Sequence, residues 1–503
     1  MKRPRHLDLW LGIGLAIAFG ALYLATFCRE VYWYDSAEFV SVAVIDGIPH
    51  PPGYPLYTLI AHLFTYLPVS PAVAVNGMSA VFGAVSVGLA FGTGRALGLN
   101  RPSAAFAAAL LGAGSVFWSN TVVAEVYTTA LAFFFCVLWL LVRAVRERRP
   151  WLAVVASALA GVTMGVHMSM ATTGLGLGLL ALASPGGLNL DGGHLRDLKR
   201  LVSRDNLRSN LLWAAACLGA AAAGAALVFG WMLIRASMHP RLNFSDPETL
   251  HGLLKMVTGG GYGHFFGETA VGPRVLDIGA TLGEQLGWVG LGLAVVGAVL
   301  GMRRRPLVVL VLLLAAAGNI AFFFDYLVHD FEVFFLPTTA MLCLLAGIGA
   351  HELSKALRPN RTWTLAVVLF ALPLANAVGS YKLNDLSDFT GARDYGEALV
   401  RELPKGAVIV HFTTPPEWAR YAVFHDYFQI IKGKRPDVTV FAWPPAPLLG
   451  RMVESGRPVY VFYPVTLLSS GTFRLEPEGH LLRVRPGLPP AGATHVSGSS
   501  GGR

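Results

Sequence analysis

Long apolar runs recur along this chain and constrain its fold more than any other feature. Runs of roughly 17 to 25 predominantly apolar residues are long enough to cross a bilayer as helices. Only 14% of the 503 residues are charged, whereas a soluble domain has about a quarter. The sequence therefore predicts a polytopic α-helical membrane protein with about eleven spans. The predicted spans are residues 8–27, 72–97, 103–119, 123–145, 151–167, 168–185, 211–235, 285–302, 306–324, 335–352 and 363–379.

Basic residues gather in every second connection between these spans, which predicts the orientation. With a cytoplasmic amino terminus, the inside segments are MKRPR, LNRP, RAVRERRP, RDLKRLVSRDNLR, MRRR and KALRPNR. The outside loops at 28–71 and 236–284 carry few Lys or Arg for their length. The alternation requires that residues 57–67 form an interfacial helix, since that stretch is too short to span. The net charge of +9 therefore marks topology, and no nucleic-acid partner is expected.

The composition changes after about residue 380, where strand and helix patterns replace the apolar runs. We expect a membrane domain at 1–380, a small extracytoplasmic α/β domain at 381–490, and a disordered Gly/Ser-rich tail at 491–503. None of the four cysteines forms a C-x-x-C pair, so neither a zinc site nor a disulfide framework can be inferred. The predicted strands are 406–412, 437–443 and 457–463, and the predicted helix is 416–433.

Polar residues lie at the predicted outer ends of the spans rather than at their midpoints. A transporter needs polar groups near the bilayer midplane to hold its substrate. Polar groups at the outer leaflet instead suit chemistry on a lipid-linked substrate whose headgroup faces outward. The alternative is that polar residues are simply less costly at helix ends than at helix centres. The residues in question are Glu125, His167, Arg235, Tyr326, His329 and Asp330.

The first outside loop begins with two carboxylates and continues into a proline-rich stretch. Asp35 and Glu38 lie three residues apart and would share one face of a helix. Two interpretations stay open: an acidic capping box, with Asp35 at the N-cap and Glu38 at N3, or a pair of functional carboxylates. The IPHPPGYPLY stretch that follows is stiff, because proline fixes φ and removes an amide donor. We expect it to form an elbow that holds residues 57–67 at the membrane surface.

The same loop carries a resemblance to a known family. DSAEF, followed by GIPHPPGYPLY and AVNGMSAVFGAVSVGLAF, resembles the GT-C membrane glycosyltransferases of the protein O-mannosyltransferase type. Similar segments further along are SNTVVAEVYTTALAF, DYLVHDFEVFFLP and GKRPDVTVF, so that the resemblance extends over most of residues 10–445. It implies a GT-C-like fold and a sugar donor carried on polyprenyl or dolichyl phosphate. It also implies Asp35 as the catalytic position, with Glu38 as its nearest competitor.

The chemistry of such a transfer explains why one carboxylate can suffice. In an inverting transfer, the base removes the proton from an acceptor hydroxyl as its oxygen attacks the anomeric carbon. The leaving phosphate needs cations or hydrogen-bond donors rather than a general acid. No motif in the sequence requires a metal, and no cofactor is expected. The predicted substrate-binding residues are His50, Tyr54, Tyr57, Glu125, His167, Arg235, Arg241, His264, Tyr326, His329 and Asp330.

The sequence thus predicts a glycosyltransferase that moves a sugar, with mannose the first candidate, from a polyprenyl-phosphate carrier to an extracytoplasmic hydroxyl on a protein or glycan. The residue usage is typical of bacteria, which predicts a plasma-membrane protein in contact with membrane lipids. Two other interpretations stay open. A flippase for lipid-linked glycans would use functional polar groups near the midplane. A non-catalytic scaffold would tolerate the joint substitution of Asp35 and Glu38.

Overall fold

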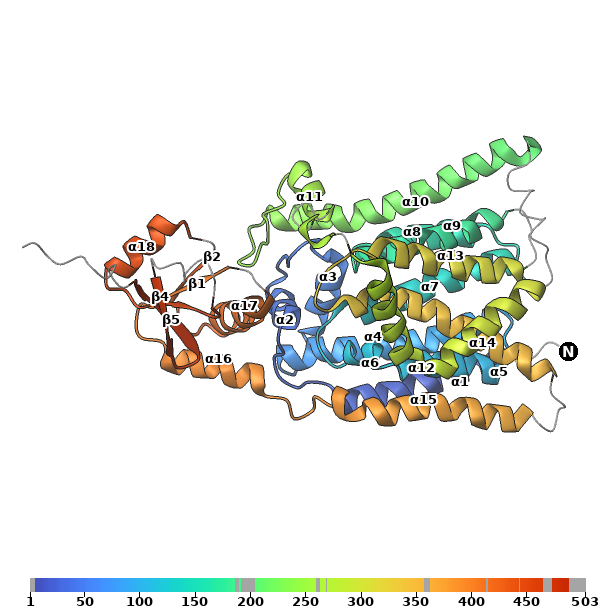
Figure 1. Cartoon of the computed structure of the whole chain (residues 1–503). Helices are drawn as coiled ribbons and strands as arrows, with labels where there is room; N and C mark the ends of the chain where they lie inside the picture. The colour runs from blue at the N-terminus through green and yellow to red at the C-terminus, as the bar shows by residue number, and fades with distance from the viewer. Residues whose placement is uncertain are drawn as a thin grey trace, which may run out of the picture. The chain divides into compact units, whose positions relative to one another are not determined.

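The chain forms two compact units. In this computed structural model, the membrane unit comprises Met1–Arg29 and Val42–Phe389, and the α/β unit comprises Glu30–Ser41 and Thr390–Arg503 (Figure 1). The short segment 30–41 of the first loop therefore belongs with the carboxyl-terminal part of the chain. The residues that the structure describes are 5–185, 190, 204–258, 263–267, 269–356, 362–412, 415–442, 444–464 and 473–487.

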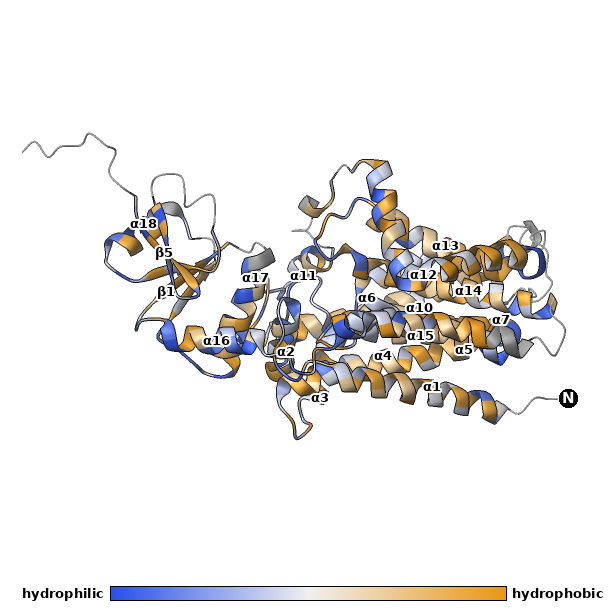
Figure 2. Ribbon diagram, turned by 60° about the horizontal axis from the view of Figure 1, so that its bottom comes forward, coloured by the Kyte–Doolittle hydropathy of each residue, from blue (hydrophilic) through white to orange (hydrophobic). Residues whose placement is uncertain are grey.

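Seven helices among the described residues are long and apolar enough to cross a membrane. Figure 2 shows that hydrophobic residues predominate along them. Together with the fold, they make this an integral membrane protein. The seven are α1 (Arg5–Thr26), α4 (Pro71–Ala96), α7 (Val126–Arg146), α10 (Arg204–Ala236), α12 (Val271–Arg304), α13 (Pro306–Phe323) and α14 (Leu336–Ala356).

The remaining predicted spans are shorter or broken, so the expected count of eleven is not confirmed. The apolar run at 103–119 divides into α5 (Arg101–Gly112) and α6 (Ser115–Ser119). The two adjoining runs at 151–167 and 168–185 fold as α8 (Trp151–Thr163), the 3-10 helix η1 (Met168–Thr173) and α9 (Gly174–Ala183). Helix α15 (Thr362–Asn384) contains the last predicted span. A hydropathy run records apolar length, and it does not reveal where the backbone turns within that length.

Small residues allow the helices of the membrane unit to pack closely. Helix α4 lies beside α1, α5 and α7, and α12 lies along α14 (Figure 1). A methyl group added at Gly297 of α12 would collide with the Leu345 carbonyl, and one at Gly349 of α14 with the Leu293 carbonyl. Such close backbone approach is typical of helix pairs in membranes, where packing and hydrogen bonds replace the hydrophobic effect.

The proline-rich elbow connects α2 (Asp35–Ile45) to α3 (Pro55–Phe64). Gly53 has a φ of 92°, and a side chain there would collide with Met232. The amide of Leu56 then donates to the carbonyl of Gly165 at 2.8 Å, which fixes the start of α3 against the membrane unit. With ten residues, α3 is too short to span a bilayer, as expected for the interfacial helix predicted at 57–67.

The α/β unit contains a five-stranded sheet in the order β2-β1-β3-β5-β4. Strand β1 pairs in parallel with β2 and β3, whereas β4 and β5 form an antiparallel hairpin. Strands β1 to β3 lie within the three predicted strand segments; the hairpin was not predicted, because charged residues interrupt its apolar pattern. The elements are α16 (Gly391–Glu402), β1 (Val408–His411), α17 (Pro415–Tyr421), the π-helix η6 (Ala422–Ile431), β2 (Thr439–Ala442), α18 (Ala446–Glu454), β3 (Val459–Val461), β4 (Phe473–Glu478) and β5 (Leu481–Pro486).

Candidate functional site

Asp35 lies at the start of α2, within the α/β unit. The preceding residue, Tyr34, has a φ of 56°, and the helix begins at Asp35 itself. Asp35 and Glu38 both occupy the first helical turn, where the helix dipole favours negative charge. The indole Nε1–H of Trp418 donates a hydrogen bond to Asp35 Oδ1 at 3.0 Å. The predicted catalytic carboxylate is therefore held by a side chain from α17.

Trp418 belongs to a stack of flat rings in the same unit. Its ring lies 5.5 Å from that of Tyr421, which in turn stacks on His425 at 4.8 Å and on His411 at 4.1 Å. Burial raises the pKa of Tyr421 well above its ordinary value, and the charges of Asp426 and Glu38 raise it further. Glu38, which is 3% exposed, therefore lies within electrostatic range of this stack.

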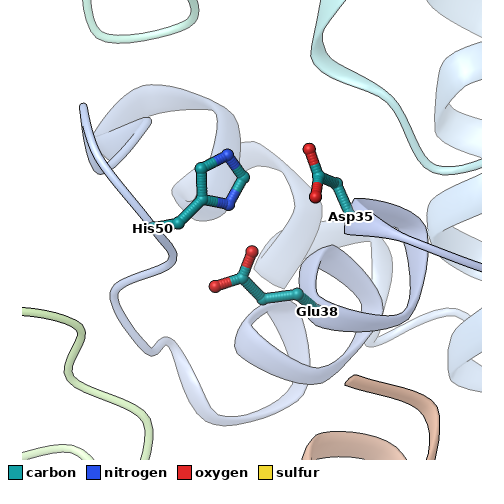
Figure 3. A group of neighbouring side chains, drawn as sticks. All are labelled: Asp35, Glu38 and His50. Carbon is teal, nitrogen blue, oxygen red and sulfur yellow. The ribbon is translucent and has the colours of Figure 1, made fainter. Parts of the chain in front are cut away.

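Asp35, Glu38 and His50 belong to one continuous stretch formed by α2 and the elbow after it. The potential ligand atoms of these three side chains all lie within 4.8 Å of one another, and Figure 3 shows the side chains turned toward a common point. Two carboxylates and an imidazole are a donor set that divalent cations accept. These three residues could therefore hold a metal ion, although the sequence itself requires none.

In the membrane unit, His50 begins a chain of aromatic contacts. Its Nε2 lies 3.1 Å from the Tyr54 hydroxyl, and the Tyr54 ring stacks on His167 at 5.7 Å. The ring of His167 also lies 4.8 Å from that of Tyr127 and 5.9 Å from that of Phe334. Three of the predicted binding residues, His50, Tyr54 and His167, are thus brought together by segments that are distant in the sequence.

The environment of His167 fixes its tautomer. The backbone N–H of Ser169 donates to His167 Nδ1 at 3.0 Å, so in the neutral ring Nδ1 is the acceptor and Nε2 carries the proton. The same hydrogen bond caps the 3-10 helix η1. His167 is only 5% exposed. It therefore offers one buried N–H donor in a fixed direction, which suits a phosphate oxygen.

Tyr326 lies on the same aromatic network, with its ring 5.0 Å from Phe334. The buried guanidinium of Arg274 donates to the Tyr326 carbonyl at 2.9 Å and to the Phe324 carbonyl at 2.7 Å, which holds this turn in place. Arg274 therefore stabilises the backbone of this turn. In the same turn, Nδ1 of His329 lies 3.6 Å from a carboxylate oxygen of Asp330, and both side chains are about half exposed.

The other predicted binding residues have different surroundings. Tyr57 is fully buried within electrostatic range of Glu125, at the base of the elbow. Arg235 lies 2.9 Å from the Asp46 carboxylate and donates to the Ile45 carbonyl, so it caps the end of α2. Arg241 is exposed. The side chain of His264 lies outside the described residues.

An apolar cavity of about 290 Å³ opens between α7, α8, α9 and α10. Met164 and Met170, which flank His167 in the sequence, both line it. From there the cavity extends along α8 and α9, past Ala160 and Gly178. Its walls carry almost no polar groups, so its chemistry suits an apolar chain.

The sequence prediction missed Trp418, Tyr421, Tyr127 and Ser169. The first two lie within PEWARY, in which the spacing of three residues places both rings on one helix face. That spacing was the available signal, but it is also typical of a packed amphipathic helix. Tyr127 and Ser169 carry no motif. Their role depends on contacts with residues far away in the sequence.

Comparison with known proteins identifies relatives for part of the chain. Residues 35–184 match the family described as the protein O-mannosyl-transferase TMEM260 N-terminal domain. The protein O-mannosyl-transferase TMEM260 of Mus musculus is 36% identical over 110 residues, which are 22% of this chain and 16% of the mouse protein. The match thus spans less than a fifth of that relative's length. The expected resemblance is confirmed over this region, which includes Asp35, Glu38, His50 and His167.

Solved structures show the same fold over nearly the whole chain. ArnT from Cupriavidus metallidurans, bound to undecaprenyl phosphate, aligns with a TM-score of 0.58 and 13% identity over 94% of this chain and 97% of ArnT. Its apo structure aligns equally well, at 14% identity. The expected GT-C-like architecture, a helical membrane unit with a small carboxyl-terminal sheet, is therefore confirmed.

Proposed function

We propose that this protein is a GT-C glycosyltransferase that moves a sugar, mannose in the first instance, from a polyprenyl-phosphate carrier to an extracytoplasmic hydroxyl on a protein or glycan. The observation that carries the proposal is the carboxylate of Asp35, held at the start of α2 by Trp418 at 3.0 Å. The match of residues 35–184 to a protein O-mannosyl-transferase domain supports both the reaction class and the sugar.

In the proposed reaction, Asp35 acts as the general base. It takes the proton of the acceptor hydroxyl while that oxygen forms a bond to the anomeric carbon. The bond between that carbon and the carrier phosphate breaks, and the phosphate leaves with the electron pair. Attack from the face opposite the leaving group inverts the anomeric configuration. Glu38, in the same turn, is the rival for the role of base.

The carrier would bind with its phosphate at the elbow and its tail in the membrane unit. His167 offers an N–H donor, and His50 lies beyond Tyr54 in the same network. Arg241 is an exposed cation of the outer loop. The apolar cavity beside Met164 and Met170 would take part of the prenyl chain. ArnT, which has the same fold, binds undecaprenyl phosphate, and this supports a carrier of that class.

The test is transfer by the purified full-length protein in lipid nanodiscs, supplied with polyprenyl-phosphomannose and candidate acceptors, with products identified by mass spectrometry. Asp35→Asn should lower turnover about 10²- to 10⁴-fold, the range typical of a lost general base, while folding is retained. Glu38→Gln is the matched control and should keep most of the activity. Unchanged turnover in Asp35→Asn would overturn the assignment of the base.

We also propose that the transfer needs no metal, because the leaving group is already a phosphate and the base is a carboxylate. Addition of a chelator to the same assay should then leave the rate unchanged. If chelation abolished transfer and a divalent cation restored it, Asp35, Glu38 and His50 would instead be metal ligands, given their spacing within 4.8 Å.

A further inference from the structure

The proposed base is held by a side chain from the carboxyl-terminal part of the chain. Trp418 and Asp35 are separated by 383 positions, yet both belong to the α/β unit, and the indole N–H lies 3.0 Å from Asp35 Oδ1. An indole N–H can only donate, and its proton does not titrate. This hydrogen bond therefore holds the carboxylate without competing for the proton that the base must accept.

Trp418 is itself held firmly. Its ring stacks on Tyr421 with an angle of 26° between the planes, and Tyr421 stacks on His425 at 17°. Behind them, the imidazole of His425 lies 2.7 Å from the buried carboxylate of Asp426. The neighbouring Glu417 is fully buried and accepts the amide N–H of Phe412 at 3.1 Å, which ties the start of α17 to the end of β1.

From this geometry, and resting on the proposed function, we propose that Trp418 is a positioning residue for the transfer reaction. The indole fixes Oδ1 and hence the plane of the carboxylate, so that the other oxygen, Oδ2, points toward the acceptor hydroxyl. The α/β unit is then part of the catalytic apparatus through α17. Trp418 acts through Asp35 and has no contact of its own with the reacting atoms.

The experiment removes the N–H and keeps the ring. Trp418→Phe keeps a ring in the stack, and replacement of Trp418 by β-(3-benzothienyl)alanine keeps the full bicyclic shape with sulfur in place of N–H. Both should lower kcat on the order of tenfold to a hundredfold, as expected for a displaced catalytic group, with KM for donor and acceptor unchanged. Replacement by 7-azatryptophan, which keeps the N–H, should restore kcat.

The control is Trp213→Phe in the membrane unit. It removes a 2.9 Å hydrogen bond from an indole N–H to the Ala181 carbonyl and should leave kcat unchanged.

A second measurement separates this proposal from the function on which it rests. Hydrogen exchange of the Trp418 indole N–H, followed by NMR and assigned with Trp418→Phe, should accelerate in Asp35→Ala whether or not any sugar is transferred. Accelerated exchange in a protein that transfers no sugar would sink the proposed function and leave the contact intact. Wild-type kcat in the benzothienyl variant, or a fall in kcat that 7-azatryptophan does not reverse, would overturn the positioning role.

Discussion

The two ring nitrogens of His167 have different surroundings, and the proposed function gives one a structural role and the other a role in binding the donor phosphate. Its Nδ1 accepts the Ser169 amide and caps η1, while its Nε2–H is a buried donor. The two roles can be separated because an asparagine side chain can still accept the amide as an N-cap. His167→Asn should therefore fold normally but raise KM for the polyprenyl-phosphate donor about tenfold, the effect of one lost charge-assisted hydrogen bond.

Steady-state kinetics with varied donor test this prediction. Ser169→Ala is the matched control: it removes the Ser169 hydroxyl, whose Oγ lies 2.6 Å from His167 Nδ1, but it keeps the imidazole and the backbone N–H that holds the tautomer. Its KM for the donor should therefore stay near the wild-type value. A His167→Asn protein with unchanged donor KM would remove His167 from the phosphate site.

The sequence could mark single residues as candidates, but it could not predict the side chains that contact them. Asp35, His50, Tyr54 and His167 could be found because they lie in or beside polar motifs at predicted outer ends of spans. Trp418 could not be found, because its contact with Asp35 bridges 383 positions and depends on how α17 packs. The sequence also could not predict that Arg235, a candidate phosphate ligand, contacts Asp46 and the end of α2.

At the scale of secondary-structure elements, the apolar cavity between α7 and α10 predicts how the carrier's tail is recognised. Gly178 of α9 lines this cavity, and an added side chain would begin in open space. Gly178→Phe should therefore fill the cavity without disturbing the helix. Exclusion of about two methylene groups of the prenyl chain costs about 1.6 kcal/mol, so KM for a long-chain donor should rise about tenfold.

A donor with a two-isoprene tail discriminates this effect from general damage, because its KM should stay unchanged in Gly178→Phe. Gly219→Phe on α10 is the control: Gly219 is also open and exposed, and it does not line the cavity. If both donors lost affinity equally, the cavity would have no role in holding the tail.

The connection between β1 and α17 makes the α/β unit sensitive to acid. Burial, with a smaller contribution from the charge of His425, lowers the pKa of His411 from 6.5 to about 4. The folded state thus disfavours the charged imidazole, so this stability is fully present above about pH 6.5 and is lost as the pH falls toward 4. The loss amounts to about 3 kcal/mol.

Hydrogen exchange of the β1 amides in the full-length protein, corrected for intrinsic rates at pH 7 and pH 4.5, measures this dependence. His411→Phe keeps a ring stacked on Tyr421 but cannot titrate, so this variant should show a smaller change in exchange between the two pH values. Burial also raises the pKa of Asp426, which acts in the opposite sense, but that effect is common to both proteins and cancels in their difference. His251→Phe, at an exposed site on α11 (Leu250–Val257), should leave the β1 exchange unchanged.

At the scale of the whole molecule, a cluster of basic residues lies at one end of the membrane unit. Asp8, at the start of α1, lies 3.0 Å from Arg95 at the end of α4 and 2.6 Å from Arg101 at the start of α5. At the same end, His351 of α14 accepts the Asn100 amide at 3.1 Å. The elbow, His167 and Tyr326 lie in connections at the opposite ends of the membrane helices, in segments poor in Lys and Arg. The spacing of charges along the sequence could predict this polarity because it depends on composition, whereas the breaks within the short helices depend on packing.

The positive-inside rule then predicts that the basic end is cytoplasmic and that the α/β unit is extracytoplasmic. Cysteines placed at exposed positions in a Cys136→Ser background test this, because the other three native thiols are buried. In intact cells, a membrane-impermeant maleimide should label Ser455→Cys of the α/β unit and should label Arg303→Cys at the end of α12 only after permeabilisation. The reverse pattern would place Asp35 on the cytoplasmic side, since it shares a compact unit with residue 455. An extracytoplasmic acceptor would then be out of its reach, so this labelling decides where the proposed transfer can occur.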